Sequence, residues 1–140
     1  MIIINASNLL VGRLASFAAK KALNGETVKV INCENAYISG GKKEIIESYK
    51  QKREMGTHST GPFFPRYADR LVKRTIRGML PFKNARGKEA FARVKCYIGV
   101  PDDLKNEKPI TISNADIQKL PNIKFMSLNT LTKHLGAKVE

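Results

Sequence analysis

Acidic side chains are scarce in this sequence. Its 140 residues include 12 Asp and Glu against 25 Lys and Arg, which gives a formal net charge of +13 at pH 7. Such an excess favours an anionic partner, which could be a nucleic acid, an anionic membrane or an acidic protein. The length fits a single domain over residues 1–140, and a hydrophobic content of 42% argues against general disorder.

Long apolar runs and clustered metal ligands are also missing. No apolar stretch approaches the ~20 residues of a membrane-spanning helix, and the short run after Met1 lacks the positive start of a signal peptide. Cys33 and Cys96 lie far apart without a CxxC companion, so we expect two buried, reduced thiols rather than a disulfide or zinc site. His58 and His134 alone cannot make a typical metal site.

The positive charge is concentrated in the middle of the chain. Residues 42–95 contain fifteen basic and five acidic side chains, a net of +10. The flanking segments are nearly neutral, with a net of +2 for 1–41 and +1 for 96–140. We therefore expect the partner to meet one face of the molecule, built mainly from the central segment.

Strand and helix signals alternate along the chain. Strands are predicted at 2–4, 27–31 and 94–99, and shorter or weaker extended segments at 36–38, 110–112 and 124–126. The first predicted helix lies between a cap at Asn5, Ser7 or Asn8 and a stop at 24–25. Further helices are predicted at 42–55, 69–80 (capped by Asp69), 86–93 and 128–135. This alternation is typical of an α/β fold with a small, mainly parallel sheet.

The helix predicted at 69–80 carries the clearest physical signal. At 100° per residue, one sector of about 100° contains Arg70, Lys73, Arg74 and Arg77. The apolar residues that point the opposite way and suit a core are Val72, Ile76 and Met79. No acidic residue inside the helix neutralises the cationic side, so contact with phosphates is favoured over an ordinary solvated surface.

The turn at 39–43 could add to this surface. Gly40 and Gly41 precede a helix and could expose backbone amides to a phosphate beside Lys42 and Lys43, or form a plain tight turn. The Walker and GxGxxG patterns of nucleotide-binding loops are absent from the sequence.

The loop at 56–68 mixes aromatic residues, prolines and cations. Phe63, Phe64 and Tyr67 could stack on unpaired bases or pin a stiff loop onto the domain. Pinning is the favoured interpretation, with His58 and Arg66 facing the nucleic acid. His58 has no acid or cysteine within several residues, so the loop does not indicate catalysis.

A basic turn follows the helix at 69–80. Pro81 ends that helix, and the cations after it are Lys83, Arg86 and Lys88. Because Gly78 and Gly87 have no side chain, an RNA backbone could approach closely there, although glycine is also common at helix ends.

Several stretches together resemble a known family. Residues 74–81 read RTIRGMLP, and RG at 86–87 and VKCYIG at 94–99 follow. With INASN at 4–8 and GRLAS at 12–16, they resemble the universal ribosomal protein L-thirteen family of the large subunit. Gly-Pro-Phe before the basic helix and Pro101 are similar to its archaeal and eukaryotic branch. The resemblance covers about residues 2–104, and the C-terminal tail is less distinctive.

This resemblance implies a three-layer α/β/α fold with a four-stranded sheet. It also implies a structural, non-enzymatic constituent of the large subunit that binds large-subunit ribosomal RNA and supports assembly, in the cytoplasm, beside neighbouring ribosomal proteins. No cofactor, membrane or small-molecule substrate is implied. The candidate RNA-binding residues are Lys42, Lys43, Arg53, His58, Arg66, Arg70, Lys73, Arg74, Arg77, Gly78, Lys83, Arg86 and Lys88.

Two other classes of function stay open at this point. One is a free nucleic-acid-binding factor, such as an assembly chaperone or a DNA-binding protein. The other is an α/β enzyme that acts on a phosphorylated or nucleotide substrate. An enzyme needs convergent acids, but Glu44, Glu47 and Glu54 are better explained by pairing with lysines along their own helix.

Overall fold

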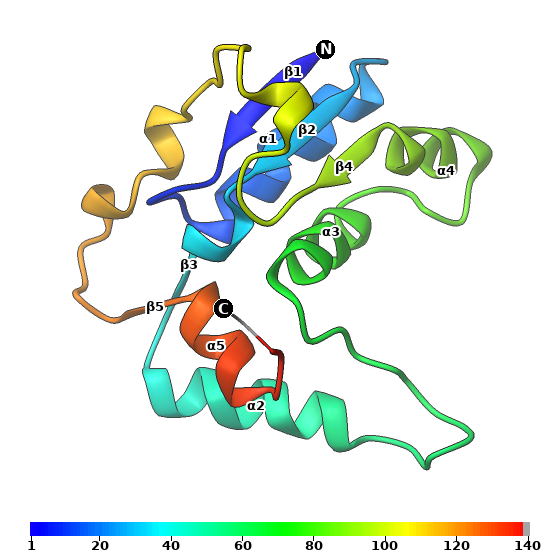
Figure 1. Ribbon diagram of the computed structural model, residues 1–140. Coiled ribbons are helices and arrows are strands. Elements are labelled where there is room, and N and C mark those ends of the chain that lie inside the picture. The colour runs from blue at the N-terminus through cyan, green and yellow to red at the C-terminus, as the bar shows by residue number, and fades with distance from the viewer. Residues whose placement is uncertain (139–140) are drawn as a thin grey trace.

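The computed structural model describes residues 1–138 (Figure 1). The strands are β1 (Ile2–Asn5), β2 (Val28–Ile31), β3 (Tyr37–Ser39), β4 (Val94–Cys96) and β5 (Phe125–Ser127). The α-helices are α1 (Val11–Leu23), α2 (Lys42–Glu54), α3 (Ala68–Gly78), α4 (Ala85–Ala92) and α5 (Leu128–His134). The predicted α/β class is confirmed, and most element ends lie within two residues of the prediction.

The parallel sheet has three strands, with β2 between β1 and β4 (Figure 1). At its β1 edge, Ile110 continues the sheet by a single parallel bridge to Ile4. The Ile110 amide donates to the Ile3 carbonyl, and the Ile110 carbonyl accepts from the Asn5 amide, but no further residue of this segment pairs with β1. The expectation of four strands is therefore wrong, and the segment predicted at 110–112 is reduced to this bridge.

The segments predicted at 36–38 and 124–126 pair with each other rather than with the parallel sheet. β3 and β5 form a separate antiparallel ladder, from Tyr37 opposite Ser127 to Ser39 opposite Phe125. The rings of Tyr37 and Phe125 meet edge to face, with their centroids 5.3 Å apart. This pairing ties the start of α2 to the segment that leads into α5.

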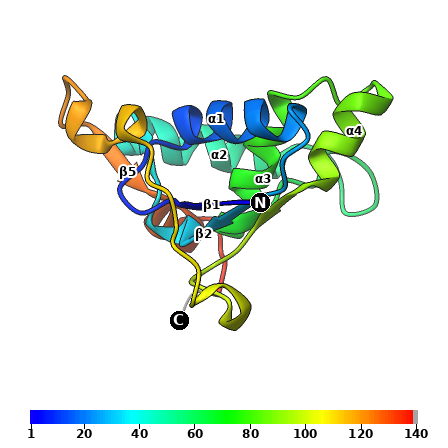
Figure 2. The same cartoon turned by 90° about the horizontal axis from the view of Figure 1, so that it is seen from above.

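Helices cover one face of the parallel sheet. Because side chains alternate along a strand, Ile4, Val30 and Val94 point to the same face, where they join a core with α1, α3 and α5. The other face carries a small separate cluster made by Ile3, Ile31 and Leu104, with Tyr97 packed against it. Leu104 belongs to a short 3₁₀ turn that lies across the sheet from α1 (Figure 2). The three-layer arrangement implied by the resemblance is thus not confirmed.

Two helices begin elsewhere than the predicted caps. Leu10 precedes α1 and Tyr67 precedes α3, and neither side chain caps its helix. Asn8 has a left-handed φ of 61°, and the Leu10 amide donates to the Ala115 carbonyl. Residues 8–10 therefore connect to the segment around Ala115 before α1 starts. Asp69 lies inside the first turn of α3, where a negative charge favours the positive end of the helix dipole.

Gly87 allows α4 to pack against the turn that follows α3. A Cβ at this position would lie 2.0 Å from the Pro81 carbonyl oxygen. The protein's own backbone therefore fills the space at Gly87, and the interpretation that RNA approaches there is wrong. The constraint fixes the path of residues 79–84, which matters for the site described below.

Gly87→Ala should lower the free energy of unfolding by about 1–3 kcal/mol, because the added methyl group overpacks this contact. Gly12→Ala is the matched control, since it also lies in a helix but a Cβ there meets nothing within 4 Å. The control should leave stability unchanged or raise it by up to ~1 kcal/mol through helix propensity. Urea denaturation measures both, and equal midpoints for the two variants would contradict the packing at Gly87.

Candidate nucleic-acid interface

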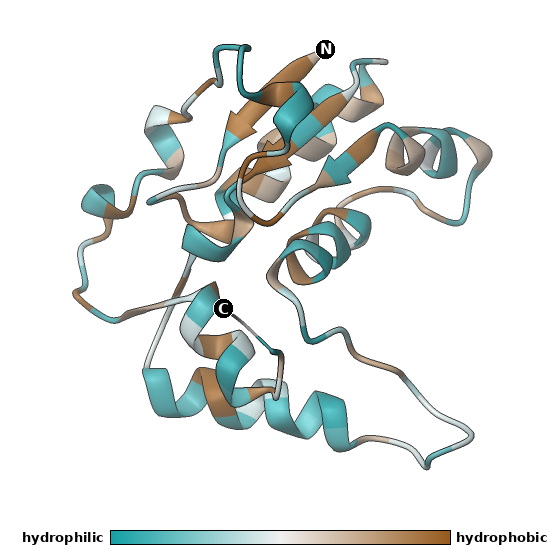
Figure 3. Cartoon of the chain, in the orientation of Figure 1, coloured by the Kyte–Doolittle hydropathy of each residue, from teal (hydrophilic) through white to brown (hydrophobic). Residues whose placement is uncertain are grey.

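Helix α3 has one buried and one cationic side. The buried side is made by Ala68, Leu71, Val72 and Ile76, none of which is more than 4% exposed. The opposite side, here called the α3 stripe, consists of Arg70, Lys73, Arg74 and Arg77, of which Lys73 is half-buried. In Figure 3 the turns of α3 carry both hydrophobic and hydrophilic colours, whereas α2 is mostly hydrophilic.

Met79 does not belong to the buried side, contrary to the prediction. It follows the last residue of α3 as its C-cap and is 41% exposed. The helical period stops applying at that point, so the side chain leaves the core and its sulfur meets the Ser16 hydroxyl at 3.4 Å.

Each cation of the α3 stripe lies over an aromatic ring. The distances from charged group to ring centroid are 5.9 Å for Arg70 and Tyr67, 5.0 Å for Lys73 and Phe91, 4.6 Å for Arg74 and Phe64, and 4.3 Å for Arg77 and Phe82. Phe64 and Tyr67 precede α3, and Phe82 and Phe91 follow it, so the α3 stripe contacts chain segments on both sides of the helix. Such contacts are attractive and restrict the directions in which the cations point.

No carboxylate in the described part of the chain pairs with the α3 stripe. The ion pairs within residues 1–138 are Lys21 with Glu26, Arg93 with Glu89, and Lys105 with Asp102. The predicted pairing of Glu44, Glu47 and Glu54 with lysines of α2 is therefore wrong; these exposed carboxylates stay solvated, since surface pairs gain little. The stripe keeps its full charge for an external anion.

A groove of about 720 Å³ opens at the carboxyl end of α3. Arg74, Arg77 and Gly78 line it on the helix side, and residues 80–84, which include Lys83, line the other side. A Cβ on Gly78 would meet nothing within 4 Å, so the protein's own packing does not require glycine there. This α3–α4 groove combines three cations, no acid and an open stretch of backbone, which suits phosphate oxygens.

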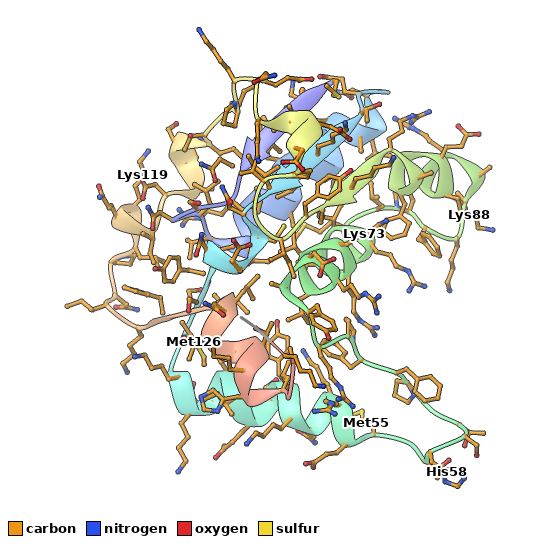
Figure 4. The ribbon with its side chains drawn as sticks, in the orientation of Figure 1. Met55, His58, Lys73, Lys88, Lys119 and Met126 are labelled. Carbon is orange, nitrogen blue, oxygen red and sulfur yellow. The ribbon has the colours of Figure 1, made fainter. Side chains whose placement is uncertain are left out.

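Arg86 and Lys88 lie outside the α3–α4 groove. Arg86 lines a second hollow of about 430 Å³ together with Lys20 of α1 and Met79. Lys88 is exposed on α4 (Figure 4). Lys20 was missed at the sequence level, because 1–41 carries little net charge and only the packing of α1 beside the turn brings this lysine close to Arg86.

The aromatic loop is pinned by one residue and not by its neighbour. The Phe64 ring lies edge to face with Tyr49, at 5.6 Å between centroids, so pinning is confirmed there. Burial raises the pKa of the Tyr49 phenol above its usual value, as expected for a packed ring. Phe63 is 72% exposed and Tyr67 38% exposed, so pinning is wrong for Phe63.

His58 and Arg66 are exposed, with His58 in the part of the loop that projects from the body (Figure 4).

The turn before α2 has an acidic side chain of its own protein close to its amides. Lys42 and Lys43 are exposed in the first helical turn. The Glu44 carboxyl group lies 3.4 Å from the position of a Cβ on Gly41, so an acid already occupies this helix start. The arrangement disfavours an external anion at these amides.

The two cysteines are free, Cys33 buried and Cys96 half-buried. The neighbouring Cys96 thiol and burial raise the pKa of Cys33 above its usual value. Within residues 1–138 no group of three or more His, Cys, Asp or Glu is placed to hold a metal ion. In the same residues no helix is long and apolar enough to cross a membrane.

A family model described as Ribosomal protein L13 matches residues 1–103. The chain belongs to this family. The ribosomal protein L13 family has a structural role and is not a family of enzymes, so the enzyme alternative is rejected.

Full-length relatives agree with the ribosomal protein L13 assignment. The large ribosomal subunit protein uL13 of Methanosarcina barkeri is 45% identical over 139 residues, 99% of each chain. Proteins with the same name from Methanopyrus kandleri and Haloarcula marismortui are 43% and 42% identical over 96% and 97% of this chain, and 86% and 91% of theirs. The relatives are archaeal, in keeping with the branch that the sequence resembles.

Arg53 has a structural contact of its own. The half-buried Arg53 side chain donates a hydrogen bond from Nη1 to the carbonyl oxygen of Leu135, the C-cap residue of α5. The contact joins α2 to α5 across 82 positions of sequence. This geometry favours stabilisation of the fold over RNA contact for Arg53.

Arg53→Ala should lower the free energy of unfolding by about 1–2 kcal/mol, because a partly buried carbonyl loses a charged donor. Lys43→Ala, which truncates an exposed cation of the same helix, should change it by less than ~0.5 kcal/mol. Urea denaturation compares the two. If Arg53→Ala is as stable as Lys43→Ala, the contact with Leu135 does not support the fold and Arg53 returns to the RNA-contact candidates.

Proposed function

We propose that this chain binds large-subunit ribosomal RNA through the α3 stripe and the α3–α4 groove. The observation that carries the proposal is a set of four cations, each over an aromatic ring, that pair with no carboxylate among residues 1–138. A helix with these properties beside an acid-free groove is suited to phosphate contacts, which set the position of a protein on folded RNA. The shape of the RNA supplies most of the specificity.

The candidate residues fall into three groups under this proposal. The central contacts are Arg70, Lys73, Arg74, Arg77, Gly78 and Lys83, all in the α3 stripe or the α3–α4 groove. The peripheral contacts are Lys42, Lys43, His58, Arg66, Arg86 and Lys88, which are exposed on flanking elements. Arg53 supports the packing of α2 on α5 instead.

The proposed role is that of a structural protein of the large subunit, which supports its assembly and stability in the cytoplasm. Family membership and full-length similarity to large-subunit proteins support this role over that of a free nucleic-acid-binding factor. Neighbouring proteins of the subunit are expected partners. The buried side of α3 belongs to the core, so its cationic side is positioned by the fold before any RNA arrives.

Reversal of Arg74 and Arg77 to Glu should abolish incorporation into the large subunit and leave the fold intact, because both side chains are exposed. The charge-matched control is Lys119→Glu with Lys124→Glu, two exposed lysines outside α3 and its groove. Circular dichroism reports folding, and sedimentation of tagged variants reports incorporation. Normal incorporation of the first variant would refute the proposal, as would equal loss from the control.

A further inference from the structure

We propose that a second groove, at the amino end of α3, binds an unpaired RNA nucleotide whose base stacks on Phe63. This inference rests on the proposed function and adds the form of RNA that is recognised. The groove measures about 610 Å³ and is lined by residues 63–67, Arg70, Gly136 and Lys138.

Phe63 is placed to receive a ring from outside the protein. It is 72% exposed, and in the described part of the chain no aromatic ring or cation stacks on it. Phe64, the next residue, has the opposite environment: its ring meets Tyr49 and lies under Arg74. One aromatic residue thus fixes the loop, and its neighbour presents an unused face to solvent.

The charge of the groove complements a nucleotide. Arg66, Arg70 and Lys138 supply three cations to its lining, and none of the acidic side chains within residues 1–138 lines it. No Asp or Glu occurs between residues 55 and 68 of the sequence. An aromatic face for the base beside cations for its phosphates is the combination by which proteins bind single-stranded nucleic acid.

The loop is ordered on both sides of Phe63. On one side, the Thr57 amide donates to the Thr60 carbonyl at 2.7 Å, and the two hydroxyls are 2.8 Å apart. On the other side, Phe64 is packed against α2. These contacts restrict the path of the loop on both sides of Phe63, which reduces the conformational entropy lost on binding.

The two grooves are joined by the α3 stripe. Arg70 lines the amino-terminal groove, and Arg74, one turn further along the helix, lines the α3–α4 groove. The rise between them is about 6 Å at 1.5 Å per residue. An RNA whose phosphates follow α3 therefore reaches Phe63 at one end, and only an unpaired base has a free face to stack there.

The direct test uses Phe63→Trp in the full chain. The sequence contains no tryptophan, so the introduced residue is the only indole in the chain, can be excited selectively over the four tyrosines, and retains a stacking face. Addition of single-stranded oligoadenylate should quench its emission. Ile123→Trp, at a residue 91% exposed on the segment before β5, is the matched control and should not respond. Bound RNA, detected by anisotropy, with unchanged emission from Phe63→Trp would overturn the inference.

A second variant separates stacking from charge. Phe63→Ala should weaken binding of oligoadenylate by at least about fivefold, the lower end for one stacked base. Binding of a mixed-sequence RNA duplex should change by less than about twofold, since its bases are already stacked. Equal loss with both RNAs would contradict the assignment to an unpaired nucleotide.

The outcomes also distinguish this inference from the proposed function. If the unmodified chain binds neither of these RNAs nor large-subunit ribosomal RNA, the proposed function fails. If it binds both RNAs and Phe63→Ala loses only incorporation into the subunit, Phe63 contacts a neighbouring protein and the nucleotide site is refuted.

Discussion

Helix α3 has to bury one side in the core while the other side holds four cations that no carboxylate of residues 1–138 neutralises. Like charges three and four residues apart destabilise a helix by about 0.2–0.5 kcal/mol for each pair. Burial of Leu71, Val72 and Ile76 opposes this repulsion, and so does the aromatic ring under each cation. The free protein therefore maintains a surface whose full electrostatic stabilisation comes only with an anion.

The rest of the fold places this helix and shapes the surface beside it. The helix-covered face of the parallel sheet receives the buried side of α3, so the cations must face outward. Close packing at Gly87 brings α4 against the turn after α3, and that turn forms the far wall of the α3–α4 groove. On the other side of α3, Phe64 holds the aromatic loop against α2. One groove therefore lies at each end of α3, because the turn after α3 packs against α4 and the aromatic loop before it packs against α2.

Local patterns predicted what depends on local interactions. The cationic side of α3 follows from its periodicity, and the strands β1, β2 and β4 follow from short apolar runs between turn residues. Extended segments were predicted at both positions, but the pairing of β3 with β5 could not be, because the two lie about ninety residues apart and neither indicates its partner. The same holds for the contact between Arg53 and the Leu135 carbonyl, which joins residues 82 positions apart. Met79 was misplaced because a helical period says nothing beyond the helix end.

The residues that match the ribosomal protein L13 family and the residues that line the two grooves lie largely in the same part of the chain. The family model covers residues 1–103. This range includes every residue that lines the two grooves except Gly136 and Lys138. RTIRGMLP, the stretch that carried the resemblance, is also the stretch that supplies Arg74, Arg77 and Gly78 to the α3–α4 groove. A motif recognised as a family signature and a groove found in the structure therefore coincide.

The central claim is tested most directly by sucrose-gradient sedimentation of a cell lysate after a ~0.5 M salt wash, with detection of this protein in each fraction. Salt at this level screens loose phosphate contacts far more than a docked, shape-matched interface. A structural protein of the large subunit should stay with the subunit at near one copy per particle. Its appearance at the top of the gradient, free of ribosomal particles, would refute a structural role in the subunit.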